Sequence, residues 1–176
     1  LESEDVKSTI KACKKLGVKI LKLSTGSYKI YGKGLGSLFA KKNTTIDCSN
    51  SGTTARLLLG ILSTTPNIEI IMTGDNSLRK RSMKELVQLL SKFGATFLPK
   101  NKFNFPLKII SSDMPVGINY SAGVSAQLKS AVILAGLNSY GNTKVTENIK
   151  SRDHTENLLK KNTNAININY GKEKII

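Results

Sequence analysis

Two apolar segments of the sequence each begin with small polar residues that could bind an anion. They are SGTTARLLLGIL, residues 51–62, and SAQLKSAVILAGL, residues 125–137. The first backbone N–H groups of a helix have no partner inside the helix, and the helix dipole makes that end positive. Gly52 would let an anion approach the backbone, and nearby hydroxyl groups could donate to it: Ser51, Thr53 and Thr54. Plain capping of a core helix by serine or asparagine is the alternative interpretation.

The second segment repeats this arrangement, because Ser125 can cap or donate and Gln127 can both donate and accept. Two buried helices that both begin with polar groups indicate that their ends converge on one site. Arginine points to the same places. Only four of the 27 basic residues are arginine, and they fall in three short segments: Arg56, Arg79, Arg81 and Arg152. Where lysine supplies ordinary surface charge, we expect arginine where a planar fork must bind carboxylate or phosphate.

Other chemistries find little support in the residue types. The one histidine, His154, cannot build a catalytic triad, and its place at a helix start is more typical of a surface residue. No His or Cys cluster has metal-ligand spacing, so we expect no metal site. Cys13 and Cys48 are far apart, which favours two reduced, buried thiols in a cytoplasmic protein. No signal peptide or membrane-length apolar run is present, so we expect no membrane partner.

The net charge of +15 predicts an anionic partner. Nucleic-acid binding is one alternative, but the lysines form no dense run and most aromatic residues fall in strand-like segments. We therefore expect small anionic substrates and no nucleic acid. Retention on DNA that persists at moderate ionic strength would favour the alternative.

The elements that position these residues recur along the chain. Residues 3–17 and 82–94 read as amphipathic helices that end at Gly17 and Gly94, with 152–165 as a weaker copy. In the first of these, Val6, Ile10 and Cys13 would form the buried face. In the last, Asp153 and Glu156 fit a capping box.

The amphipathic helices alternate with the two buried helices, whose glycines Gly60 and Gly136 are 76 residues apart (136 − 60). Strand candidates follow at 67–74 and 142–148. This period predicts an α/β fold that repeats a unit of a buried helix, a strand, an outer helix and two strands. The first unit would be incomplete, because the chain begins at an outer helix, and we expect a fragment of a longer protein.

Taken in order, NSGTTARLLLG, GDNSLRKRSM, SAQLKSAVILAGL and SRDHTE resemble the signature segments of the 5-enolpyruvylshikimate-3-phosphate (EPSP) synthases, in the bacterial branch with Ser-Ala-Gln. The resemblance runs over essentially the whole chain. It implies that the full unit of the fold is βαβαββ, with buried parallel helices and outer sheets. It also implies that residues 1–176 form most of the N-terminal-side domain of a two-domain enzyme, with the second domain absent. That enzyme transfers the enolpyruvyl group of phosphoenolpyruvate to the 5-hydroxyl of shikimate-3-phosphate in the shikimate pathway. It uses no cofactor.

The same resemblance implies which residues bind each substrate. Those for shikimate-3-phosphate are Ser125, Ala126, Gln127, Ser151 and Arg152; those for phosphoenolpyruvate, and for the herbicide glyphosate, are Asn50, Gly52, Thr53, Arg81 and Gln127. Arg56 is expected to be structural. Ser49 stands where the family commonly has glycine, and Ser82 where proline usually follows the arginine.

The family's lysine between the substrates and its acid–base carboxylates would lie outside this chain. The resemblance therefore assigns no catalytic residue to it and implies that the fragment alone is inactive. A UDP-N-acetylglucosamine enolpyruvyl transferase is the nearest alternative, but that enzyme lacks the S-R-D-H-T-E segment.

Overall fold

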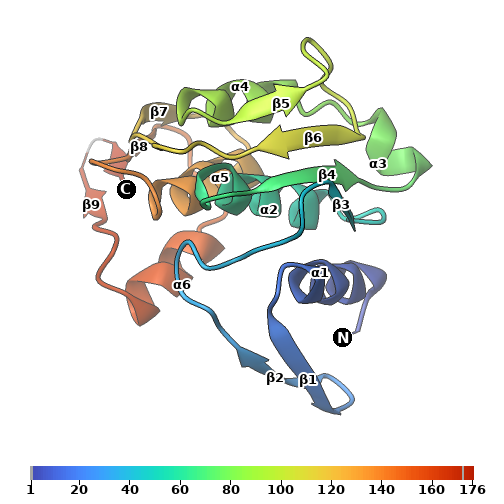
Figure 1. Ribbon diagram of the computed structural model, residues 1–176. Helices are drawn as coiled ribbons and strands as arrows, with labels where there is room; N and C mark the ends of the chain where they lie inside the picture. Colours follow the sequence, from blue (N-terminus) through green and yellow to red (C-terminus); the bar gives the residue numbers. More distant parts are fainter. Residues whose placement is uncertain (1, 172) are drawn as a thin grey trace.

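Two consecutive stretches of the chain fold into the same six-element unit (Figure 1). The computed structural model describes residues 2–171 and 173–176. Unit 2, as we call the earlier complete one, consists of β3 (Thr44–Asp47), α2 (Gly52–Thr64), β4 (Glu69–Thr73), α4 (Lys84–Lys92), β5 (Thr96–Leu98) and β6 (Leu107–Ile110). Unit 3 consists of β7 (Asn119–Ala122), α5 (Ala126–Gly136), β8 (Lys144–Glu147), α6 (His154–Asn162), β9 (Asn169–Tyr170) and β10 (Lys174–Ile175). The predicted βαβαββ order is confirmed.

The two units also share their sheet topology, with strand orders β3-β4-β6-β5 and β7-β8-β10-β9. In each sheet the first two strands are parallel, and the later pairs are antiparallel. The chain begins with α1 (Glu4–Lys15) and the antiparallel hairpin of β1 (Lys19–Ser24) and β2 (Ser27–Tyr31). These match the last three elements of a unit. A short helix, α3 (Asn76–Lys80), lies between β4 and α4.

Helices α2 and α5 lie side by side in the middle of the molecule and run parallel (Figure 1). At their C-terminal ends the Thr64 hydroxyl donates to the Ala135 carbonyl at 3.1 Å. A Cβ on Gly60 would lie only 2.4 Å from the Ala131 carbonyl oxygen, so glycine allows the two backbones to touch. Because each helix is covered by the other and by the sheets, both are apolar on nearly all faces.

The spacing of the repeat needs a correction. Gly60 faces α5, whereas Gly136 lies against Thr143 of its own unit, so the two glycines are not equivalent. The equivalent residues are the caps Ser51 and Ser125, 74 residues apart (125 − 51), each accepting from the backbone N–H three residues later. The helix stops are as predicted: Gly17 and Gly94 both adopt positive φ angles, which end α1 and α4.

The buried face predicted for α1 is wrong at Val6, which is exposed, and Ile10 is only half-buried. The fully buried residues are Ser8, Ala12 and the following Leu16. Small residues occur here because α1 packs closely on α2, where the Thr9 and Thr54 hydroxyls are 2.5 Å apart. Cys13 lies on the other side and is only half-buried, against our expectation.

Cys48 is fully buried, as expected, and both cysteines are free thiols. Burial, together with the nearby charge of Asp47, raises the pKa of Cys48 to about 12. The thiol therefore stays protonated at neutral pH. In the part of the chain that the structure describes, no helix is long and apolar enough to span a membrane.

Candidate substrate site

The hydroxyl groups at the N-terminus of α2 have two different roles: some cap the helix, and one is exposed to a ligand. The Ser51 hydroxyl accepts from the Thr54 amide at 3.2 Å and from the Thr54 hydroxyl at 2.8 Å, and Thr54 in turn contacts α1. The capping interpretation is therefore right for Ser51, and both hydroxyls face inward. Only Thr53 is exposed and able to reach a ligand. Gly52 is buried at the first position of the helix.

Gln127 joins the N-termini of the two buried helices. Its amide nitrogen donates to the Thr53 hydroxyl at 2.8 Å, and its amide oxygen accepts from the Arg56 guanidinium at 2.9 Å. Both helix ends therefore meet at one place, as the paired polar segments predicted. Two positive dipole ends and their unpaired N–H groups converge there, which favours a bound anion.

Arg56 and Arg81 converge on Gly52. A Cβ on this glycine would lie 2.7 Å from Arg56 Nη1 and 2.9 Å from Arg81 Nη1, so a larger residue here would displace both guanidinium groups from these positions. Arg81 also donates to the Asn50 side-chain oxygen at 2.8 Å. Burial and the neighbouring positive charge of Arg81 lower the pKa of Arg56. Repulsion between the two cations would be relieved by an anion bound between them.

None of the four arginines forms an ion pair among the described residues, in which all eight carboxylate contacts are made by lysine. Arg56 instead donates to the Gly52 carbonyl and to the Gln127 side-chain oxygen. Arg79 donates to the Gly74 carbonyl at the end of β4, which holds its segment in place. The arginines near the helix ends thus keep their charge for a ligand.

Beside the arginine pair, a pocket of about 530 Å³ lies at the N-terminus of α5. The five residues expected to bind shikimate-3-phosphate all line it: Ser125, Ala126, Gln127, Ser151 and Arg152. Lys150 lines the pocket as well, and our sequence analysis did not single it out, because one exposed lysine among 23 carries no signal. Gln127 is common to this pocket and to the arginine pair, so the two anion sites adjoin.

His154 begins α6 and is exposed, lining a small pocket with Thr53, Gln127 and Arg152. The capping box predicted for this helix is wrong. The Asp153 side chain makes no capping bond, and Glu156 is fully buried with its carboxylate directed at two lysines, Lys129 and Lys174.

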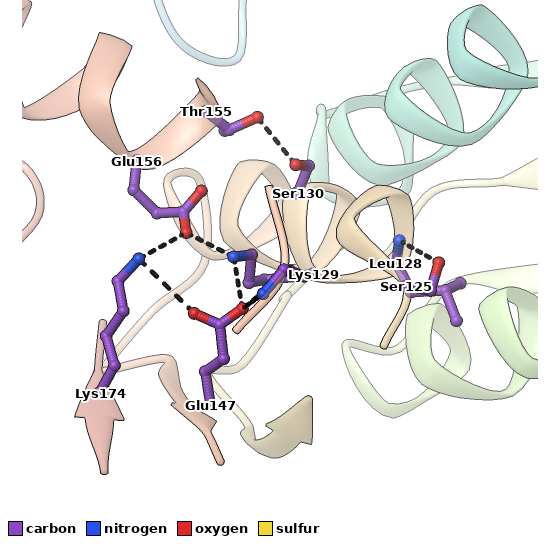
Figure 2. A network of polar contacts seen from close by, with 9 residues as sticks. Ser125, Leu128, Lys129, Ser130, Glu147, Thr155, Glu156 and Lys174 are labelled. Atoms are coloured by element: carbon purple, nitrogen blue, oxygen red, sulfur yellow. Dashed lines mark hydrogen bonds and ion pairs between the residues drawn. The ribbon is translucent and has the colours of Figure 1, made fainter. Parts of the chain in front are cut away.

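These groups and Glu147 form a buried cluster of two lysines and two glutamates (Figure 2). Lys129 lies in the first turn of α5 with no exposed surface, and its Nζ is 2.7 Å from one oxygen each of Glu147 and Glu156. Glu147 also accepts from the Ser151 amide at 2.8 Å and from the Ser151 hydroxyl at 2.7 Å. We call this set the Lys129 cluster. Sequence reasoning missed it, although a charge inside an otherwise apolar helix was the available signal.

Within residues 2–171 and 173–176, no three His, Cys, Asp or Glu side chains are grouped so as to hold a metal ion. The helix N-termini, arginines and amide groups gathered here are suited to bind and orient two anionic small molecules beside each other.

Comparisons with known proteins agree with this description. The sequence model of EPSP synthase (3-phosphoshikimate 1-carboxyvinyltransferase) matches residues 1–176, and the chain belongs to this family. It is 42% identical over 160 residues to the 3-phosphoshikimate 1-carboxyvinyltransferase of Ruegeria sp. (strain TM1040), covering 90% of this chain and 35% of the relative. With the enzyme of that name from Thermodesulfovibrio yellowstonii the identity is 44% over 161 residues, or 91% and 37% of the two chains.

Among solved structures, EPSP synthase from Acinetobacter baumannii superposes with a TM-score of 0.87 at 36% identity, over 99% of this chain and 39% of that one. The family resemblance inferred from the four motifs is confirmed, and so is the fold class. The chain spans a little over a third of the length of the relatives it matches.

Proposed function

We propose that this chain supplies the shikimate-3-phosphate and phosphoenolpyruvate contacts of one domain in an enzyme that transfers the enolpyruvyl group to the 5-hydroxyl of shikimate-3-phosphate. The observation that carries the proposal is the junction at Gln127, where two helix N-termini meet beside three arginines that form no ion pair among the described residues. Shikimate-3-phosphate would occupy the pocket of Ser125, Ala126, Gln127, Ser151 and Arg152.

Phosphoenolpyruvate would bind at the adjoining pair of guanidinium groups, contacting Asn50, Gly52, Thr53, Arg81 and Gln127. In the proposed reaction, the 5-hydroxyl loses its proton to a base as its oxygen bonds to C2 of phosphoenolpyruvate, and the C2–C3 double bond opens as C3 gains a proton. C3 then loses a proton as the C2–O bond to phosphate breaks, and phosphate leaves. The role of this chain is to hold both anions with the reacting atoms adjacent, because orientation and charge compensation lower the barrier.

Residues 1–176 would form most of the N-terminal-side domain of a cytoplasmic enzyme, and a second domain would complete the cleft. No group in the described site is placed as the acid or base of the transfer. We therefore expect the isolated chain to bind shikimate-3-phosphate weakly and to show no turnover.

Calorimetric titration at millimolar shikimate-3-phosphate tests this proposal. Binding is expected for the wild type and for Lys161→Ala, which removes an exposed charge in the last turn of α6, but not for Arg152→Ala. Absence of binding by the wild type, or equal binding by both variants, would contradict the assignment of this pocket. Release of phosphate from both substrates by the purified chain would contradict the expected inactivity.

A further inference from the structure

The Lys129 cluster is attached to the proposed phosphate pocket through a single serine. The Glu147 Oε1 atom accepts from Lys129 Nζ at 2.7 Å and, on its other side, from the backbone amide and the hydroxyl of Ser151. Ser151 lies between Lys150 and Arg152, and all three residues line the pocket. Among the described residues, these two bonds from Ser151 are the hydrogen bonds that tie the exposed segment 148–152 to the core.

The charges of the cluster are buried and matched. Lys129 and Glu156 have no exposed side-chain surface, and that of Glu147 is 1% exposed. Lys174, on β10, contacts both glutamates at 3.1 and 3.5 Å and is 14% exposed. Two cations and two anions therefore compensate each other. Such a buried set seldom stabilises a fold more than apolar side chains of similar volume would, so its presence calls for another explanation.

The repeat shows that the fold itself does not require these charges. In unit 2 the residue four positions after the cap is Ala55, where unit 3 has Lys129. The last residue of the parallel strand pair is Thr73, where unit 3 has Glu147. The third residue of the outer helix is Leu86, where unit 3 has Glu156. All three are buried and uncharged, and the unit has the same topology.

The two units differ in how they hold the loop after this strand. In unit 2, that loop contains α3, capped by Asp75 and fixed by the bond from Arg79 to the Gly74 carbonyl, and it leads to Arg81. In unit 3, the corresponding segment 148–153 has no helix and leads to Arg152. In unit 3 the contact between Glu147 and Ser151 holds this segment, as α3 and the bond from Arg79 hold the loop in unit 2.

We propose that Glu147 is a positioning residue for the phosphate-binding segment: through Ser151 it sets Lys150 and Arg152 at the pocket, and Lys129 holds Glu147 in place. This inference rests on the proposed function for the identity of the ligand. It also refines the role of Ser151. Because its amide and its hydroxyl hydrogen are both used by Glu147, Ser151 acts mainly as the anchor of the segment, and Arg152 and Lys150 supply the charge for the phosphate.

Two variants of the 176-residue chain test the proposal. Glu147→Gln keeps the shape of the side chain and removes its charge. The triple variant Lys129→Ala, Glu147→Thr, Glu156→Leu places the residue types of unit 2 in unit 3. Glu69→Gln is the matched control. Glu69 lies on β4 of unit 2, away from the pocket, and also pairs with two lysines, Lys42 and Lys108. The readouts are hydrogen exchange of the Ser151 amide and the Kd values of shikimate-3-phosphate and shikimate.

We expect both variants to fold. The triple variant removes the acceptor and should lose protection of the Ser151 amide and bind shikimate-3-phosphate about tenfold more weakly, as for loss of a charge-assisted contact. Glu147→Gln keeps a neutral acceptor oxygen, so both effects should be present but smaller. Shikimate, which lacks the phosphate, should bind them as it binds the wild type, and Glu69→Gln should change nothing. A purely structural role would weaken both ligands equally.

An unchanged Ser151 amide, an unchanged Kd for shikimate-3-phosphate, or a triple variant that cannot fold would overturn the inference. If the wild type bound no shikimate-3-phosphate, the proposed function would fail by itself. The exchange of the Ser151 amide would then still decide whether Glu147 fixes the segment.

Discussion

At the scale of single residues, the proximity of Arg56 and Arg81 is the feature most open to test. Arg81→Ala should weaken phosphoenolpyruvate binding by about ten- to a hundredfold, because a hydrogen bond to a charged group contributes ~1.5–3 kcal/mol. An NMR titration measures this Kd. Lys80→Ala is the matched control, since it removes the same charge from the neighbouring exposed residue of α3. Equal Kd values for the two variants would show that Arg81 acts only through general charge.

The residues that sequence reasoning found and those that it missed differ in the physics that places them. Ser125, Gln127 and Gly52 follow from local rules, because the first turn of any helix needs partners for its free N–H groups. Lys129 and Glu156 do not, because their burial depends on elements that meet only in the folded chain. The same reason explains the wrong capping box. Glu156 had an ion-pair partner in α5 that no local pattern could reveal.

At the scale of elements, the contact between α2 and α5 sets the geometry of the site. Gly60→Ala would place a Cβ against the backbone of Ala131, where no side-chain rotation relieves the overlap. We expect the free energy of unfolding to fall by about 1–3 kcal/mol, the cost typical of overpacking. Urea denaturation at neutral pH measures this loss. Gly32→Ala is the control, because a Cβ there meets nothing within 4 Å. Similar midpoints for both variants would mean that the helices can separate at little cost.

Secondary structure was the easier part of the fold to predict. The outer helices and their glycine stops follow from periodicity, since Gly17 and Gly94 supply the backbone angles that other residues avoid. The face of α1 was misassigned because its buried side is small rather than apolar. Close packing on α2 selects Ser8 and Ala12, and hydrophobicity alone does not report how near a neighbour will come.

At the scale of the whole molecule, acid should unfold this protein readily. Burial would raise the pKa of Glu147, but hydrogen bonds from Lys129 and Ser151 outweigh that effect and lower it to about 2. Hydrogen bonds, first from Lys22 and then from Gly26, lower the pKa of Glu2 to about 2 as well. A carboxyl group whose pKa is depressed on folding stabilises the protein above its unfolded value of 4.5, and that contribution is lost as the pH falls toward 2.

Urea midpoints measured between pH 7 and pH 2.5 should therefore fall steeply below pH 4.5. The Glu147 contribution is on the order of 3 kcal/mol. The growing excess of positive charge, already +15 at neutral pH, adds to the loss. High salt should reduce the part due to the exposed pair of Glu2 and Lys22 and leave the buried part. A midpoint that does not change with pH would show that these carboxylates are equally stabilised in the unfolded chain.

The hairpin of β1 and β2 has a bearing on handling the protein. Both edges of this ribbon are open among the described residues, and it exposes Leu21, Leu23 and Ile30. Strand edges of this kind invite association between molecules, and interspersed lysines such as Lys22 and Lys29 oppose it. Reagents that acylate amines would therefore remove positive charge that opposes association of molecules through the edges of this ribbon.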